Sequence, residues 1–226
     1  TPRLRREGRP MRGIRPEMLL DERHHLTNAI EALLFTPPVP LDGVDLAAPG
    51  AYAFVYIGDR AMYGRARPRI DACRCPARLV TGGGSPIYVG KARSLRARMR
   101  QHCRYLVPCT DIGVDDLAVV PIPTVSEAGA LYIEALLIAA YRPVWNEPWL
   151  SGFGSKPQGV TRTRHQRAPH WSVLHPGRHA LDHRAHAPAR RALAVRVRDH
   201  LEATVSDVYT ALPARVEGAA DALTVR

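Results

Sequence analysis

The stretch that decides the fold runs from Pro86 to Tyr105 and reads PIYVGKARSLRARMRQHCRY. Its first residues, 86–90, predict a short β-strand, and the basic residues after them predict a helix over 92–105. Arg98 and His102 are four residues apart on this helix, so they lie on one face, one turn from each other. A guanidinium can hold a phosphate oxygen with paired hydrogen bonds, and a nearby histidine can accept or relay a proton.

Around this unit, apolar patterning predicts two more strands and a long helix. Residues 51–57 alternate as a strand, with Tyr52, Phe54 and Tyr56 on one face. A further strand is expected over 116–123. Residues 127–141 are apolar nearly all round, which predicts a helix buried on all sides. The order strand, strand, helix, strand, helix predicts an α+β fold with a small central antiparallel three-stranded sheet flanked by helices.

The charge of the chain favours a polyanionic partner. The net charge is +11 and the isoelectric point is about 10.1, which is typical of proteins that bind nucleic acid. Nearly all the basic residues are arginines, with Lys91 and Lys156 the only lysines. The bias could also reflect the nucleotide composition of the source genome, so charge alone leaves the function open.

The four cysteines, Cys73, Cys75, Cys103 and Cys109, fit a reduced cytoplasmic protein. Cys73 and Cys75 with nearby histidines could form a zinc site, but their spacing matches no recognised zinc-binding pattern. No apolar run is long enough to span a membrane, and no secretory signal is visible after the basic N-terminal stretch. We therefore expect a cytoplasmic protein with no membrane partner.

The predicted central helix contains one anomaly. Glu134 is the only charged residue between Ala128 and Tyr141. A buried carboxylate is costly unless it is paired, so Glu134 either forms a salt bridge or holds a metal ion. A hard cation such as Mg²⁺ needs few protein ligands, because water and substrate phosphate complete its coordination.

Several short motifs occur one after another along the chain, and each of them alone is weak evidence of function. They are Gly50-Ala51-Tyr52, Tyr88-Val89-Gly90 with Lys91-Ala92 after it, Leu95-x-x-Arg98, Glu134 and Asn146. This ordered set resembles the GIY-YIG nuclease domain from about residue 50 to 147. A literal Tyr56-Ile57-Gly58 lies on the first strand with no basic helix behind it, so we take Tyr88-Val89-Gly90 as the second motif.

Three further features resemble the type II restriction endonuclease branch of that superfamily. His102 stands one turn after Arg98, a long insert separates the two motifs, and the C-terminal part contains Gly152-Phe153-Gly154, Trp171 and Leu174-His175-Pro176-Gly177-Arg178. The branch that these features resemble cuts the GC-only palindrome CCGCGG. The alternatives that stay open are a repair or homing-type GIY-YIG nuclease and a non-catalytic DNA-binding protein.

The resemblance implies a catalytic set of seven residues: Tyr52, Tyr88, Lys91, Arg98, His102, Glu134 and Asn146. In this reading Glu134 binds Mg²⁺ (or Mn²⁺), Arg98 stabilises charge on the phosphate, and Tyr52 orients or deprotonates the attacking water. Tyr88 and His102 would complete the hydrogen-bond network, and Asn146 would position a tyrosine or the phosphate. A tyrosine acting as a base needs nearby positive charge, which Lys91, Arg98 and His102 could supply.

The resemblance also implies partners and a division of the chain. The substrate would be double-stranded DNA, the enzyme a homodimer matching a palindrome, and a cognate DNA methyltransferase would belong to the same system. Candidate DNA-binding residues are Arg65, Arg67, Arg69, Arg162, Arg164, Arg167 and Arg178. The expected parts are a disordered basic arm (1–15), an N-terminal helical extension (16–48, with a helix over 17–35), a catalytic core (49–150, with an insert at 58–85) and a DNA-contacting and helical C-terminal extension (151–226, loop-like to 191, with a helix over 189–209).

Overall fold

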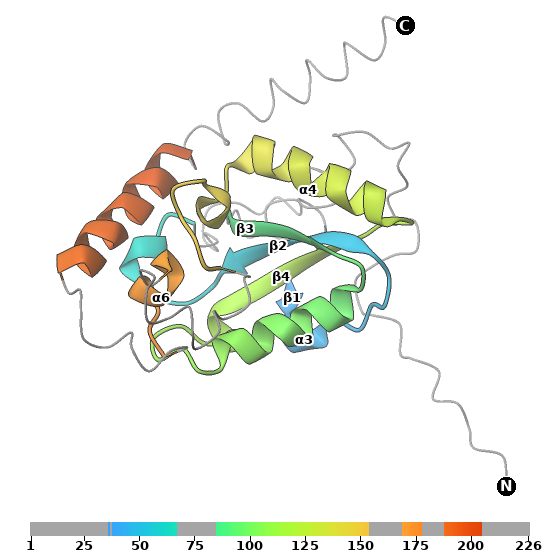
Figure 1. Cartoon of the computed structure of the whole chain (residues 1–226), viewed down its shortest axis with the longest axis horizontal. Helices are drawn as coiled ribbons and strands as arrows, with labels where there is room; N and C mark the ends of the chain where they lie inside the picture. The colour runs from blue at the N-terminus through green and yellow to red at the C-terminus, as the bar shows by residue number, and fades with distance from the viewer. Residues whose placement is uncertain (1–35, 37, 67–84, 154–168, 178–187, 205–226) are drawn as a thin grey trace, which may run out of the picture.

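One antiparallel sheet forms the centre of the molecule (Figure 1). The computed structural model describes residues 36, 38–66, 85–153, 169–177 and 188–204. The strand order is β1-β4-β2-β3, and the bounds are Val39–Pro40 for β1, Gly50–Tyr56 for β2, Pro86–Ala92 for β3 and Leu117–Pro123 for β4. The predicted α+β class is confirmed. The fourth strand, β1, went unpredicted because two residues are too few to show an alternating pattern.

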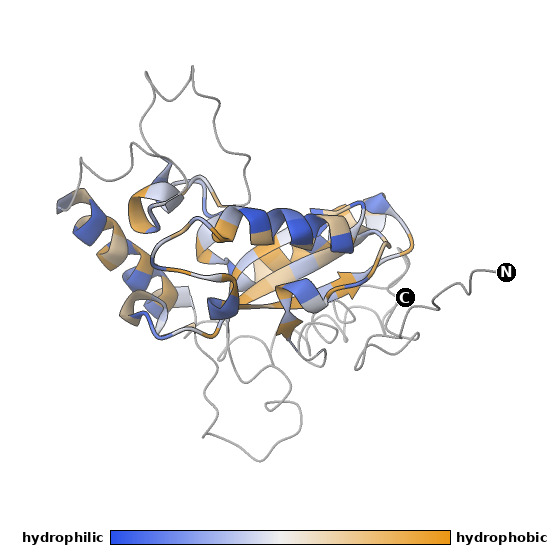
Figure 2. Cartoon of the chain, turned by 90° about the horizontal axis from the view of Figure 1, so that it is seen from below, coloured by the Kyte–Doolittle hydropathy of each residue, from blue (hydrophilic) through white to orange (hydrophobic). Residues whose placement is uncertain are grey.

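Two helices cover opposite faces of this sheet: α3 (Leu95–Leu106) and α4 (Glu127–Tyr141) (Figure 1). The predicted alternation in β2 is confirmed. Tyr52, Phe54 and Tyr56 belong to the core cluster that includes the buried residues of α3. The intervening residues of β2 pack with the buried residues of α4. In Figure 2 the strands are coloured mainly hydrophobic, whereas many residues of α3 are hydrophilic.

The long apolar helix, α4, has the predicted bounds but not the predicted burial. Ser126 caps its N-terminus by accepting a hydrogen bond from the Gly129 amide at 3.0 Å. One face packs on the sheet, while Leu131 and Tyr132 on the outer face are 51% and 46% exposed. The prediction of a helix buried on all sides is therefore wrong. Alanine and leucine favour a helix wherever they stand, so their presence all round did not mark which face was buried.

The C-terminal part packs on the core more than its loop-like composition suggested. A short helix, α6 (His170–Leu174), lies within the predicted loop and buries Trp171 and Leu174. Five residues are too short for a helical period to be visible in the sequence. A second helix covers residues 188–204, beginning one residue before the predicted 189–209, and residues 205–209 lie outside the described residues. The predicted helix over 17–35 also lies outside them. Among the described helices, none is long and apolar enough to cross a membrane.

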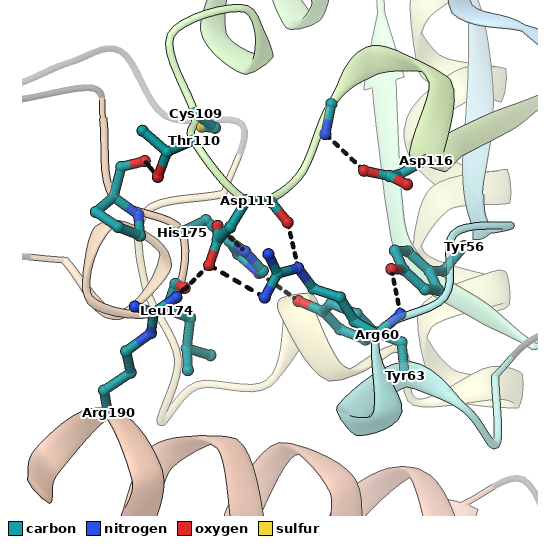
Figure 3. A network of polar contacts seen from close by, with 12 residues as sticks. Tyr56, Arg60, Tyr63, Cys109, Thr110, Asp111, Asp116, Leu174, His175 and Arg190 are labelled. Atoms are coloured by element: carbon teal, nitrogen blue, oxygen red, sulfur yellow. Dashed lines mark hydrogen bonds and ion pairs between the residues drawn. The ribbon is translucent and has the colours of Figure 1, made fainter. Parts of the chain in front are cut away.

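A buried polar network fastens the C-terminal part to the core (Figure 3). His175 is fully buried, and its Nδ1 lies 3.2 Å from an Asp111 carboxylate oxygen while its Nε2 lies 2.8 Å from the Tyr63 hydroxyl. The Tyr63 oxygen also accepts a hydrogen bond from the Trp145 indole N–H at 2.9 Å. Burial lowers the pKa of His175, so the ring is neutral, donates from Nδ1 to Asp111 and accepts from Tyr63 at Nε2.

Asp111 joins two arginines from distant segments to the same network (Figure 3). Arg60, at the start of the insert, pairs with one Asp111 carboxylate oxygen at 3.2 Å, and Arg190, from helix 188–204, contacts the same oxygen. Arg190 also donates to the Leu174 carbonyl at 3.0 Å. Burial opposes ionisation of Asp111, but the hydrogen bond from His175 and the charges around it lower its pKa below the ordinary value. The network thus fixes four chain segments around one ionised carboxylate.

Candidate active site

The two motif tyrosines lie side by side on the α3 face of the sheet. In the β2–β3 pairing Tyr52 stands opposite Gly90, and Tyr88 stands opposite Phe54. A Cβ atom added at Gly90 would lie 2.5 Å from the Tyr52 hydroxyl and 2.9 Å from the Tyr88 ring. Glycine is required at position 90 because the Tyr52 hydroxyl occupies the space that a side chain would need.

The Tyr52 hydroxyl is the centre of the site's hydrogen bonds. It lies 2.9 Å from His102 Nε2 and accepts a hydrogen bond from Arg98 Nε at 3.0 Å. It also has a hydrogen-bond interaction with Tyr88, which interacts with Arg98 as well. The helical spacing had placed Arg98 and His102 on one face of their helix, and the shared contact with Tyr52 is in line with that placement.

Burial separates the roles of the two tyrosines. Tyr52 has no exposed surface, and burial, followed by the neighbouring Tyr88, raises its pKa well above 10 despite the opposing charge of Arg98. Burial also raises the pKa of Tyr88, and here too the Arg98 charge opposes it. Tyr88, however, is only partly buried. Tyr88 is therefore the tyrosine that a water molecule or a phosphate can approach directly.

Glu134 and Lys91 lie across the edge strand from the tyrosines. Lys91 follows Tyr88 by three residues, so it points to the α4 face of β3, where its Nζ lies 3.6 Å from a Glu134 carboxylate oxygen. Burial raises the pKa of Glu134, and the charges of Lys91 and Arg98 oppose that shift. The Glu134 charge in turn raises the pKa of Tyr88. Glu134 and Arg98 therefore act in opposite directions on the pKa of Tyr88.

The donor set around Glu134 suits a hard cation that keeps most of its water. In the described residues no group of three or more His, Cys, Asp or Glu side chains lies together. The Glu134 side chain is 19% exposed, and its Lys91 partner is 45% exposed and at the long end of the salt-bridge range. An accessible single carboxylate fits Mg²⁺, which usually binds through one or two carboxylates together with water and phosphate.

Asn146 reaches the site through the backbone of β3. Its side-chain oxygen accepts from the Val89 amide at 2.7 Å, and its side-chain nitrogen donates to the Val89 carbonyl at 2.8 Å. Both backbone groups lie on the free side of an edge strand. Asn146 therefore fixes the strand segment between Tyr88 and Gly90, and it contacts neither tyrosine hydroxyl directly in the hydrogen bonds of the described residues.

Two residues that the sequence did not mark as part of the site support it. The Phe153 ring packs against Tyr88, with the ring centroids 4.5 Å apart, and against His102, with the centroids 5.7 Å apart. It also packs against Trp171, with the centroids 4.4 Å apart. Gln101 contacts Arg98 directly. The Gly152-Phe153-Gly154 motif could have indicated the first of these, whereas nothing in the sequence distinguished Gln101 from any exposed helical glutamine.

The candidate DNA-binding arginines are mostly beyond the described part of the chain. Arg65 is described and exposed. The others, Arg67, Arg69, Arg162, Arg164, Arg167 and Arg178, lie outside the described residues, as do Cys73 and Cys75. Cys103 and Cys109 form no disulfide among the described residues. Within the predicted DNA-contacting and helical extension, residues 169–177 pack into the core with Trp171, Leu174 and His175 buried.

Fold and site together define a nuclease of the GIY-YIG type, with its motif residues meeting at the edge strand β3. The family described as the Eco29kI GIY-YIG domain matches residues 45–204, well over half of the chain. The chain therefore belongs to this family of GIY-YIG restriction endonucleases, which act on DNA. No curated protein matches the sequence. The match includes helix 188–204, so the C-terminal part that the Asp111 network fastens belongs to the family's domain.

Proposed function

We propose that the protein is a type II restriction endonuclease that hydrolyses both strands of a short GC-rich palindrome, CCGCGG, with one divalent metal ion in each active site. The observation that carries the proposal is the meeting of Tyr52, Tyr88, Arg98 and His102 with Glu134 around the edge strand β3. The specificity rests on the resemblance of the C-terminal motifs to the branch that cuts this sequence.

Glu134 is the residue that would hold the metal ion. Bound there, Mg²⁺ or Mn²⁺ would polarise the scissile phosphate and stabilise the leaving 3′ oxygen. The Lys91 ammonium group lies 3.6 Å from a carboxylate oxygen of Glu134. Because Lys91 is half-exposed and flexible, it can turn from Glu134 toward a phosphate oxygen when the carboxylate takes another partner.

Arg98 binds the phosphate, and the three residues joined to it provide a path for the water's proton. The guanidinium stabilises the extra negative charge of the transition state. The attacking water gives its proton to Tyr88 while the Tyr88 proton moves to Tyr52 and the Tyr52 proton moves to Nε2 of His102. No tyrosine is left ionised, which agrees with the raised pKa of both tyrosines. His102 ends the transfer as the imidazolium ion.

The test is digestion of a mapped plasmid by wild type, Glu134→Ala and Glu127→Ala, in Mg²⁺ and in EDTA, with the fragment ends sequenced. Glu127 is a matched control because it lies on the same helix as Glu134. Its carboxylate pairs with Arg93 at a distance of 2.8 Å and not with Lys91. We expect discrete fragments with CCGCGG at the junctions from wild type and Glu127→Ala. We expect Glu134→Ala to be at least about 100-fold slower. Equal digestion by all three would contradict the metal assignment, and DNA binding without cutting would point to a non-catalytic binder.

The dimer is tested by mixing active and inactive subunits. A palindrome cut on both strands calls for two active sites related by the symmetry of the DNA. Preparations of wild type mixed with excess Glu134→Ala protein should therefore produce nicked circles before linear DNA. Linear product at the wild-type rate in every mixture would argue against one site per subunit. The cognate methyltransferase is tested separately, since plasmid modified at CCGCGG should resist cutting.

A further inference from the structure

A chain of side chains on α3 continues the active site beyond Arg98. Arg98 Nη1 donates to the Gln101 side-chain oxygen at 2.5 Å, and Gln101 Nε2 donates to the Tyr105 hydroxyl at 2.8 Å. Gln101 and Tyr105 are three and seven residues after Arg98, so all three lie on the same flank of the helix. Both are partly exposed, as Arg98 is, and this flank borders the site.

The chemistry of the three groups fixes which way the Gln101 amide points. A guanidinium can only donate hydrogen bonds, so the amide oxygen must face Arg98 and the amide NH₂ must face away from it. Tyr105 accepts from that NH₂ and holds the amide in this orientation. Gln101 therefore presents an acceptor to Arg98 and not a competing donor.

Two hydrogen bonds then fix the plane of the Arg98 guanidinium. Nε donates to Tyr52 on one side, and Nη1 donates to Gln101 on the other. A planar guanidinium held by hydrogen bonds at two of its nitrogens has a fixed orientation, whereas one held at a single nitrogen can still rotate. Because Gln101 is neutral, it orients the guanidinium without offsetting the positive charge that the phosphate needs.

We infer that Gln101 is a positioning residue for DNA cleavage: it holds Arg98 so that the remaining N–H groups face the scissile phosphate, and Tyr105 keeps Gln101 in the orientation that does so. The inference rests on the proposed function, because it assigns Gln101 a role through Arg98 in that reaction. Displacing a catalytic group by about 1 Å can slow a reaction up to about 100-fold. Arg98 keeps its contacts with the two tyrosines, so we expect the loss of Gln101 to slow cleavage about tenfold.

The test is a double-mutant cycle with the full-length protein, read as the single-turnover cleavage rate at saturating DNA. Gln101→Met keeps the length of the side chain and removes the acceptor. We expect this variant to cut about tenfold more slowly than wild type, with an unchanged melting temperature and a DNA dissociation constant within about twofold. In an Arg98→Ala background the same substitution should change the rate less than twofold, because Gln101 acts through Arg98. Tyr105→Phe should slow wild type less than Gln101→Met does, and should add nothing to Gln101→Met.

Cys103→Ala is the matched control. Cys103 lies on the same turn of α3 and packs against the core rather than against Arg98, so its truncation should leave the rate within about twofold of wild type. A wild-type rate from Gln101→Met would overturn the inference, as would an equal loss with and without Arg98. Neither result would affect the proposed function, which fails only if wild type itself does not cut DNA in the presence of metal.

Discussion

Gly90→Ala tests whether the close contact of the two motifs controls catalysis. The backbone of Gly90 is ordinary β-strand, so alanine meets no backbone strain there. Its Cβ would lie 2.5 Å from the Tyr52 hydroxyl, whereas ordinary van der Waals contact begins at 3.4 Å. The hydroxyl or the strand must therefore move by about 0.9 Å, the difference between these distances.

A movement of this size breaks the hydrogen bonds at the centre of the site. The Tyr52 contacts with His102 and Arg98 are 2.9 and 3.0 Å, and a shift of about 0.9 Å away from either partner takes it beyond hydrogen-bond range. Crowding a packed interior typically costs about 1–3 kcal/mol of stability. We expect a folded protein whose cleavage rate is lower by about 100-fold, since a misplacement of about 1 Å has an effect of that order.

The assay is single-turnover cleavage of a plasmid, with thermal unfolding of the same preparations. Gly43→Ala is the control, because its nearest neighbour would be Pro40 at 3.8 Å and the residue is exposed. Gly43→Ala should cut and melt as wild type does. If Gly90→Ala also cut at the wild-type rate, cleavage would not depend on the position of the Tyr52 hydroxyl or on its hydrogen bonds.

Three further substitutions probe the scaffold. Asn146→Asp keeps the acceptor for the Val89 amide but turns a carboxylate toward the Val89 carbonyl. It should lower the free energy of unfolding by about 2 kcal/mol in urea titrations and slow cleavage. Wild-type stability of Asn146→Asp would contradict the role of Asn146 in holding β3. Ser126→Ala should cost about 1 kcal/mol by the same measurement, because it removes the N-cap of α4, and should leave the cleavage rate unchanged. Burial lowers the pKa of His175 from 6.5, so below about pH 6.5 the unfolded chain takes up a proton that the folded chain does not. The melting temperature of wild type should therefore fall as the pH drops below about 6.5. His175→Gln should be less stable by about 2 kcal/mol, and its melting temperature should fall less steeply with pH. Parallel pH dependences of wild type and His175→Gln would show that the buried imidazole is not the group being titrated.

The parts of the fold that follow from local patterning were predictable from the sequence. Alternation in residues 51–57 sorted Tyr52 from Ala53 onto opposite faces of the sheet, and the helical spacing placed Arg98 and His102 on one face of their helix. The apolar pattern over 127–141 gave the bounds of α4 to the residue. Each of these signals is carried by residues within one or two turns of each other, where geometry leaves few alternatives.

What depended on contacts between distant segments was not predictable. The sequence assigned the attacking water to Tyr52, but the packing of the neighbouring elements leaves Tyr52 fully buried and Tyr88 partly exposed, which no local pattern indicated. The Asp111 network brings together residues more than 60 positions apart, and no short pattern marks its members. Gln101 is local to Arg98, but its role depends on the guanidinium turning toward it, which no residue spacing specifies.

The position of β3 at the edge of the sheet would let residues on opposite faces serve one phosphate in the proposed reaction. If β3 were a central strand, it would have a neighbouring strand on each side. Those strands would separate Tyr52 and Arg98 on the α3 face from Lys91 and Glu134 on the α4 face. Beyond an edge strand there is no such neighbour, so side chains from both faces can reach the same point past its backbone. An exposed edge is also liable to pair with other chains, and Asn146 removes part of that liability by occupying both backbone groups of Val89. The same two hydrogen bonds that protect the edge therefore also hold the strand that the two halves of the site share.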